Sequence, residues 1–216
     1  MTVLGDIAQA RNLLGGRLLR SVEFLINLVL LSILVLVTSV GVITMYAAVI
    51  AAHGVVRDWA RLGETSVIRP FVRHLRRHVG AGIALVVPFV LPLVIGWCDL
   101  NWVIHIRPTQ LRWPILLVTV AFIAVFLAIS AVLPAVLVHY ESSVPAALRY
   151  AAGTALARPL SSIACVAVIA LTVIIGVVVP ISPLITVGIS VWLMHRIWSA
   201  VFATDEASGA NPSPAG

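Results

Sequence analysis

Hydrophobic residues follow one another in long runs along most of the chain, and short segments rich in arginine separate these runs. The apolar runs cover residues 22–56, 80–97, 114–138 and 160–199. A transmembrane helix needs about 20 mostly apolar residues, whereas a membrane β-barrel needs alternating segments of about ten residues. The long runs without alternation therefore predict an all-α fold, a polytopic membrane helical bundle.

Two of these runs are too long for one crossing of a bilayer core that is about 30 Å thick. The segment 38–41 (TSVG) interrupts the first run and predicts helices at about 22–38 and 41–56, although one long tilted helix is the alternative. The segment 180–183 (PISP) breaks the last run, because proline lacks an amide hydrogen and disfavours helix at the preceding residue. With both breaks, the sequence predicts six transmembrane helices.

Arginine is unequally distributed between the two sides of this predicted bundle. All fourteen basic residues are arginine, and the formal net charge is +6. If six spans cross the membrane in alternating directions, only Arg107 and Arg112 lie on one side of it. The other twelve arginines then lie on the side that also holds both termini. Cytoplasmic loops carry an excess of Lys and Arg, so both termini are expected in the cytoplasm. In a membrane protein such a basic balance indicates contact with anionic lipid, and we expect no nucleic-acid partner.

The same map divides the chain into three regions. Residues 1–21 are expected to form an N-terminal cytoplasmic interfacial segment, and residues 22–202 a six-span membrane domain. Residues 203–216 lack large apolar side chains after their start and are rich in Pro, Gly and Ser, which predicts a disordered C-terminal tail. Cys98 and Cys165 have no metal-binding or redox spacing, so we expect no disulfide, metal or other cofactor.

The basic cluster at 64–80 is the most distinctive local feature of the sequence. Pro70 suits the beginning of a helix, and apolar residues then recur at spacings of three and four, with arginine and histidine between them. This pattern predicts an amphipathic cytoplasmic loop helix that lies at the membrane interface and binds lipid phosphates. A docking surface for a partner is the alternative. The candidate lipid or partner contacts are Arg69, Phe71, Arg73, Arg76, Arg77 and Arg149.

A short echo of this region occurs later in the chain. ETSV at 64–67 recurs as ESSV at 141–144, and each copy precedes a predicted loop helix. The match is compatible with a two-span repeat and also with chance, and the sequence leaves both open.

Polar side chains inside the predicted spans are few. Glu23 lies at the inner end of the first span, where it reaches water or pairs with Arg20, and His53 lies near the inner end of the second. The candidate intramembrane polar residues are Glu23, Asn27, Thr44, Tyr46 and His53. Those without charge are expected to form hydrogen bonds between helices. No ionisable residue is expected near the middle of a span, where an ion-coupled carrier usually needs one. Because Walker and nucleophile-elbow patterns are also missing, we expect no enzymatic activity.

The order of these pieces resembles the YesL-like family of small bacterial integral membrane proteins of unknown function. The resemblance rests on TSVGVIT (38–44), MYAAVIAAHGV (45–55), RDWARLGE (57–64), FVRHLRRHVG (71–80) and ALRYAAGTALARPLSSIA (147–164). It implies a bacterial inner membrane location and an association with carbohydrate uptake, including ABC-type sugar permease subunits as partners.

Two functions follow as expectations. The first is a non-enzymatic accessory or assembly component of a bacterial carbohydrate transport system. The alternative is a small oligomeric membrane transporter or channel for a small solute, which would make the chain a homo-oligomer.

Overall fold

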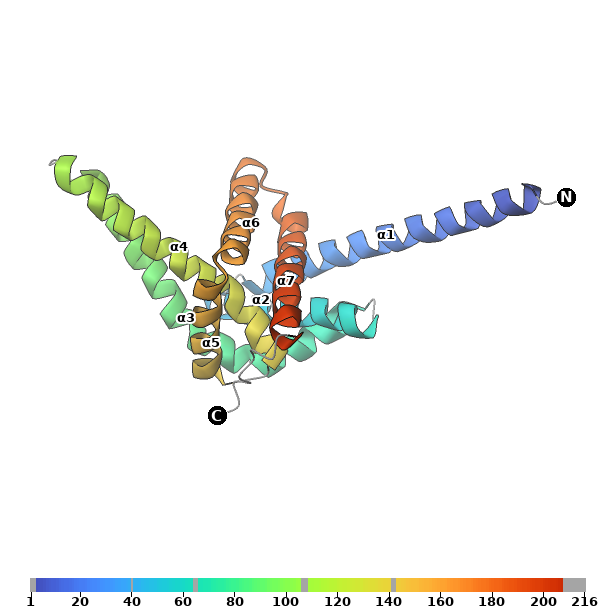
Figure 1. The fold of residues 1–216 in the computed structure, drawn as a ribbon, viewed down its shortest axis with the longest axis horizontal. Coiled ribbons are helices and arrows are strands. Elements are labelled where there is room, and N and C mark those ends of the chain that lie inside the picture. Colours follow the sequence, from blue (N-terminus) through green and yellow to red (C-terminus); the bar gives the residue numbers. More distant parts are fainter. Residues whose placement is uncertain (1–2, 40, 64–65, 106–108, 141–142, 208–216) are drawn as a thin grey trace.

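The computed structural model describes residues 3–39, 41–63, 66–105, 109–140 and 143–207, which are helical apart from short turns (Figure 1). The helices are α1 (Val3–Ser39), α2 (Val42–Leu62), α3 (Ile68–His105), α4 (Thr109–Tyr140), α5 (Val144–Ala157), α6 (Pro159–Val178) and α7 (Pro183–Ala207). The predicted all-α class is confirmed.

Four of the described helices are long and apolar enough to cross a membrane. They contain the segments Leu19–Ser39, Arg112–Tyr140, Pro159–Val178 and Pro183–Thr204, and α3 gives a fifth if its two bent halves form one span. These helices support the prediction of a membrane protein, but they do not confirm six spans. The predicted second span, α2, is not among them, because Arg57, Asp58 and Arg61 in its last turns reduce its apolar character.

The two predicted breaks in the longest apolar runs are confirmed. α1 ends at Ser39 and α2 begins at Val42, which excludes one long helix over 22–56. The Thr44 hydroxyl donates to the carbonyl oxygens of Thr38 and Gly41, so the turn between the helices is closed by local hydrogen bonds. The PISP segment likewise separates α6 from α7.

The loop helix that was predicted before the third span is not a separate element. It is the first part of α3, which runs without interruption to His105 and bends by 41° between Ile68–Val86 and Pro88–Val103. The bend falls where Pro88 lacks an amide hydrogen. α5, in contrast, is a separate helix, as predicted for the segment after the second copy of the echo, and Pro145 lies in its first turn.

The ends of the chain are more helical than expected. α1 is continuous over Val3–Ser39, so no helix break marks the expected boundary at residue 22. α7 continues to Ala207, and residues 203–207 are therefore helical, whereas the expected tail at 208–216 lies outside the described residues. Val201 and Phe202 are buried in the core, at the end of the segment that was predicted as the membrane domain.

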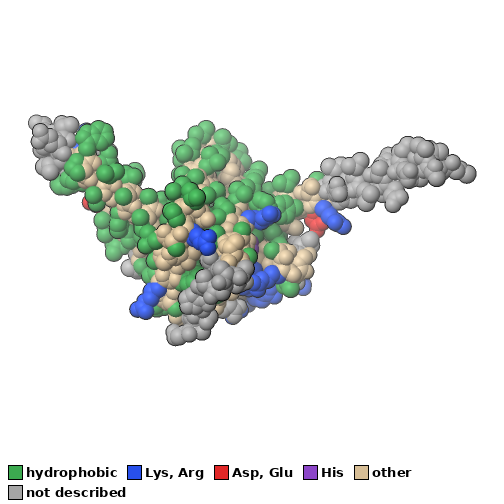
Figure 2. Space-filling model, viewed as in Figure 1, with side chains coloured by type: hydrophobic (Ala, Val, Ile, Leu, Met, Phe, Trp, Pro, Cys, Tyr) green, Lys and Arg blue, Asp and Glu red, His purple; other side chains and the backbone are tan. Residues whose placement is uncertain are grey.

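The helix α2 forms the centre of the molecule. Between Ala47 and Val56 every residue except Val49 is buried, and α2 packs against α1, α3, α4 and α7. In Figure 1, α3 and α4 extend together to one side, α1 projects to the other, and α6 and α7 form a hairpin between them. Figure 2 shows apolar side chains over most of the visible surface, with separate groups of arginine side chains in the middle and the lower part of this view. The exposed apolar faces are those expected of helices in lipid.

Small residues allow the helices to approach closely. A Cβ atom on Gly82 of α3 would lie 2.8 Å from the backbone nitrogen of Ala47 in α2. In the pair of α1 and α7, a Cβ atom on Gly188 would overlap the carbonyl oxygen of Leu28. There the Ser32 hydroxyl accepts from the Gly188 amide at 2.8 Å and donates to the Leu28 carbonyl at 2.9 Å. Close backbone approach at small residues is typical of membrane helix pairs.

We predict that Gly188→Ala lowers the stability of the protein, because the added methyl group must push α7 away from α1. Overpacking of this kind costs about 1–3 kcal/mol, which should lower the midpoint of thermal unfolding in detergent. Gly80→Ala is the matched control, since nothing lies within 4 Å of a Cβ atom there. Alanine is favoured over glycine in a helix by about 1 kcal/mol, so this variant should unfold at an equal or higher temperature. Equal destabilisation of both variants would contradict the prediction.

Candidate functional site

Asp58 connects the end of α2 to the beginning of α3. Its Oδ2 atom accepts from Arg73 Nη2 at 2.8 Å and lies 2.8 Å from His74 Nε2, while Arg57 Nε is 3.9 Å from Oδ1. Asp58 is 6% exposed and His74 is 5% exposed, so this contact is largely removed from water. Hydrogen bonds to an ionised group are about twice as strong as neutral ones, and this one fixes the two helices at their shared end.

The local sequence explains how these residues meet. Gly63 ends α2 with φ 65°, a left-handed conformation that favours glycine, and its amide donates to the Trp59 carbonyl. The chain then reverses, and α3 begins at Ile68. Gly54 makes room for the His74 ring, because a Cβ atom there would lie 2.6 Å from Cγ of that ring.

The outer side of the same helix carries an exposed basic surface. A hollow of about 560 Å³ is lined by Ile68, Arg69, Val72, Arg73 and Arg76, which together we call the basic surface. The Arg73 side chain remains 62% exposed even though one of its nitrogens binds Asp58. Within the described part of the chain, Arg69 and Arg76 form no ion pair. Their charges are therefore available to an anionic ligand or surface.

The structure divides the predicted contact residues into two groups. Phe71 is only 1% exposed and packs in the core beside α2, so it supports the helix rather than contacting a partner. Arg77 is exposed on the same helix as the basic surface, whereas Arg149 is exposed on α5 and does not line that hollow. Glu64 and Glu141 lie outside the described residues, and so does the start of each copy of the sequence echo.

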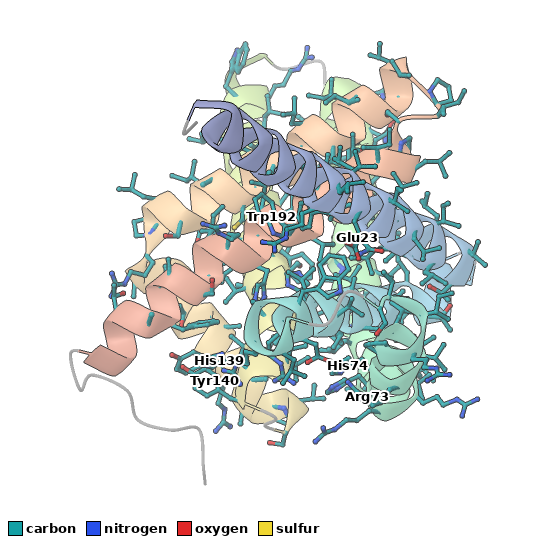
Figure 3. All side chains as sticks on the ribbon, turned by 90° about the vertical axis from the view of Figure 1, so that its right-hand side faces the viewer. Glu23, Arg73, His74, His139, Tyr140 and Trp192 are labelled. Carbon is teal, nitrogen blue, oxygen red and sulfur yellow. The ribbon has the colours of Figure 1, made fainter. Side chains whose placement is uncertain are left out.

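A second hollow lies between α1, α2 and α7, and we call it the α1–α2–α7 cavity. Its volume is about 410 Å³. The side chains around it are Arg20, Glu23, Phe24, Asn27, Val56, Trp59, Ala60, Trp192, His195 and Arg196, with Gly63. Figure 3 shows Glu23 and Trp192 close to each other beside α1, apart from Arg73 and His74 at the beginning of α3. Two of the predicted polar residues, Glu23 and Asn27, therefore share one cavity.

Aromatic rings form one wall of the α1–α2–α7 cavity. The Phe24 ring meets the rings of Trp59 and Trp192 edge to face, with centroids 6.1 Å and 5.7 Å apart. The Arg196 guanidinium lies 5.3 Å from the centroid of the Trp192 ring, a cation–π contact. Within the described residues, the side chains of Arg20, Glu23 and Asn27 form no ion pair or hydrogen bond. Glu23 and Arg20 are thus neighbours at the cavity but are not paired.

Histidine side chains lie at this cavity and behind it. His53 is completely buried, and neither of its ring nitrogens has a hydrogen-bond partner among the described residues. Its ring centroid is 6.2 Å from that of His195, which lines the α1–α2–α7 cavity. His195 also borders a small hollow with Arg57 and His139, and Arg57 donates to the Val138 carbonyl. Four imidazole or guanidinium groups from α2, α4 and α7 therefore gather in this part of the bundle.

The remaining predicted polar residues have structural contacts. Thr44 closes the turn before α2, as described above. The Tyr46 hydroxyl donates to the Ser130 carbonyl at 3.2 Å, and the Tyr46 ring stacks on Phe89 with a centroid separation of 4.8 Å. These are the helix-to-helix contacts expected for uncharged polar residues in a membrane bundle.

Asp58, Trp192 and Arg196 are among the residues of these sites that were not predicted from the sequence. Asp58 is an acidic residue in an otherwise basic segment, RDWAR, and that isolation was a usable signal. Trp192 and Arg196 belong to the last span, where WLMHR gives an aromatic and a basic residue one turn apart. That spacing predicts a shared helix face, but not which helix the face meets.

Residues 25–100 match the model of a family described as "Protein of unknown function, DUF624". The match covers the last part of α1, from residue 25 onward, all of α2 and most of α3, and it includes Asp58, Arg73 and His74. It confirms the resemblance inferred from the sequence, because YesL-like proteins are members of that family. The chain has no significant similarity to a curated protein or to a solved structure.

We predict that Asp58→Asn destabilises the protein by about 1.5–3 kcal/mol, the range for a hydrogen bond to a charged group. The substitution leaves the buried His74 ring and the Arg73 guanidinium without their anion. Arg76→Gln is the matched control, because Arg76 is exposed on the same helix and forms no ion pair with a described residue. It should change the midpoint of thermal unfolding in detergent very little. A midpoint that is the same for Asp58→Asn and the parent would show that Asp58 does not connect the helices energetically.

Proposed function

We propose that this chain is a multi-pass protein of the bacterial inner membrane that acts as a non-enzymatic accessory or assembly subunit of a carbohydrate transport system. The observation that carries the proposal is the basic surface at the beginning of α3. It combines the guanidinium groups of Arg69 and Arg76, which form no ion pair within the described residues, with the exposed apolar side chains of Ile68 and Val72. Asp58 holds the helix of this surface in place. The carbohydrate system itself is taken from the resemblance to YesL-like proteins.

The basic surface suits a protein partner that presents carboxylates beside apolar groups. Arginine is favoured at such interfaces because its planar donor group binds carboxylate with two parallel hydrogen bonds. Complementary charges also accelerate association and select the partner. In this proposal the partner is an ABC-type sugar permease subunit, and anionic lipid occupies the same surface when the partner is absent.

The proposed topology has six spans with both termini in the cytoplasm. It therefore counts α2 as a span, in addition to the four long apolar helices and α3. α2 has 21 residues, and at about 1.5 Å per residue it is long enough for the bilayer core. The charged residues Arg57 and Asp58 lie near one end of it and contact each other, Arg73 and a backbone carbonyl. Such pairing lowers the cost of placing charges near the membrane.

We predict that the two ends of α3 lie on opposite sides of the membrane. Cys98 is exposed and Cys165 is buried, so a membrane-impermeant maleimide should label Cys98 on intact spheroplasts. In a Cys98→Ser background, Ser66→Cys should be labelled only after the membrane is permeabilised, because Ser66 is exposed in the proposed cytoplasmic loop. Labelling of Ser66→Cys from outside would contradict the proposed topology, since either α2 does not cross or the orientation is inverted.

A second candidate function is a small oligomeric transporter or channel. Asn27 favours it, because this polar side chain from a span lines the α1–α2–α7 cavity. Thr44 and Tyr46, which would line a path deeper in the bundle, instead form hydrogen bonds within the protein. For this reason we rank transport second.

We predict that replacing both Arg69 and Arg76 with Glu reduces co-purification with permease subunits from native membranes by at least about tenfold. Loss of close interfacial charge pairs costs about 1.5 kcal/mol or more, and 1.4 kcal/mol corresponds to a factor of about ten in affinity. Arg112→Glu is the control, because Arg112 is exposed at the beginning of α4, on the opposite side in the proposed topology.

Two results together would overturn the accessory function. The purified protein would transport a small solute into liposomes, and no permease subunit would co-purify with it from native membranes. Uptake that depends on Asn27 would then establish the transporter. Recovery of permease subunits that is unaffected by the double substitution would show that the basic surface is not the docking site.

A further inference from the structure

We infer that the α1–α2–α7 cavity is a binding site for a phosphodiester that carries free hydroxyl groups, the headgroup chemistry of phosphatidylglycerol. The inference does not depend on the proposed docking function, because the cavity and the basic surface use different residues. Its volume of about 410 Å³ falls in the range of small-molecule sites.

The residues of α1 supply the first part of the argument. Arg20, Glu23, Phe24 and Asn27 recur at the three- and four-residue spacing that places side chains on one helix face. This face offers a cation, a carboxylate, a ring and an amide to one cavity. None of its polar side chains is paired with another described residue. A ligand that meets them must contain both an anion and hydrogen-bond donors.

The residues of α7 define where the anion binds. Arg196 lies on the Trp192 ring, and this contact restrains the guanidinium without using its N–H groups. A guanidinium held in this way still presents N–H donors that match the geometry of two phosphate oxygens. Together with Arg20, it gives the cavity two cations against the one carboxylate of Glu23. A ligand with a single negative charge therefore neutralises the site.

Glu23 and Asn27 select the rest of the headgroup. A carboxylate only accepts hydrogen bonds, so it repels a bare phosphate but binds hydroxyl groups. The glycerol headgroup of phosphatidylglycerol has such hydroxyls beside one anionic phosphodiester. A choline headgroup has neither donors nor a net negative charge.

The surroundings of the cavity suit a lipid. Trp59 and Trp192 line it, and tryptophan is enriched at the level of lipid headgroups. On α1, Val22, Leu25 and Ile26 are exposed next to it and offer an apolar surface for acyl chains. The cavity is also open, so a headgroup reaches it from the side without unfolding a helix.

Native mass spectrometry of the detergent-purified protein tests this inference. Dihexanoyl phosphatidylglycerol is compared with dihexanoyl phosphatidylcholine, which has the same chains, and with glycerophosphoglycerol, which has the same headgroup without chains. We predict that phosphatidylglycerol binds at least about tenfold more tightly than phosphatidylcholine. The double variant Arg20→Gln with Arg196→Gln should lose at least that factor.

Two further variants make the result specific. Glu23→Gln should bind the anionic lipid but lose its preference for phosphatidylglycerol over phosphatidic acid methyl ester, which has one charge and no hydroxyl. Arg112→Gln, at the beginning of α4, should leave binding unchanged. Equal binding of phosphatidylglycerol by the double variant, or equal binding of both dihexanoyl lipids by the parent, would overturn the inference. If glycerophosphoglycerol binds as tightly as the lipid, the inferred headgroup chemistry stands, but the ligand is a soluble phosphodiester and not a lipid.

Discussion

The close approach of α2 and α3 determines how the rest of the molecule is arranged. Ala47 meets Gly82 near one end of this pair, and Gly54 leaves room for His74 near the other. Because the two glycines let α2 and α3 lie close together, the buried Asp58 carboxylate reaches donors on α3. The same contact turns the arginines of the first part of α3 outward. The position of the basic surface is thus a consequence of small residues that lie elsewhere in the pair.

Breaks that depend on local chemistry could be predicted from the sequence. The segment TSVG ends α1, and PISP separates α6 from α7, since glycine and proline act on the chain next to them. The continuity of α3 could not be predicted in the same way. An amphipathic stretch followed by an apolar one has the same pattern whether one helix or two carry it. The structure shows one helix from Ile68 to His105, and Phe71 and His74 in its first turns pack against α2.

The candidate sites were harder to predict than the helices. Glu23 and Asn27 were recognised as polar residues in an apolar run, because that contrast is visible in the sequence alone. Their meeting with Trp192 and Arg196 depends on which helices become neighbours, and those residues are far apart along the chain. The same reason explains Asp58, whose partners lie in the next helix. The sequence therefore indicated which residues were candidates, but it did not indicate which residues from other helices would lie beside them.

The hydrogen bond between Ser32 and Gly188 has a consequence for biosynthesis. It joins positions 156 residues apart, so the main partner of the first helix is synthesised after the other described helices. At about 5–20 residues per second, translation needs on the order of ten seconds to produce α7 after α1 has entered the membrane. During that interval the Ser32 hydroxyl is satisfied within its own helix, by the Leu28 carbonyl. Before α7 is synthesised and packs against it, α1 therefore exposes no unsatisfied hydroxyl donor to lipid at this position.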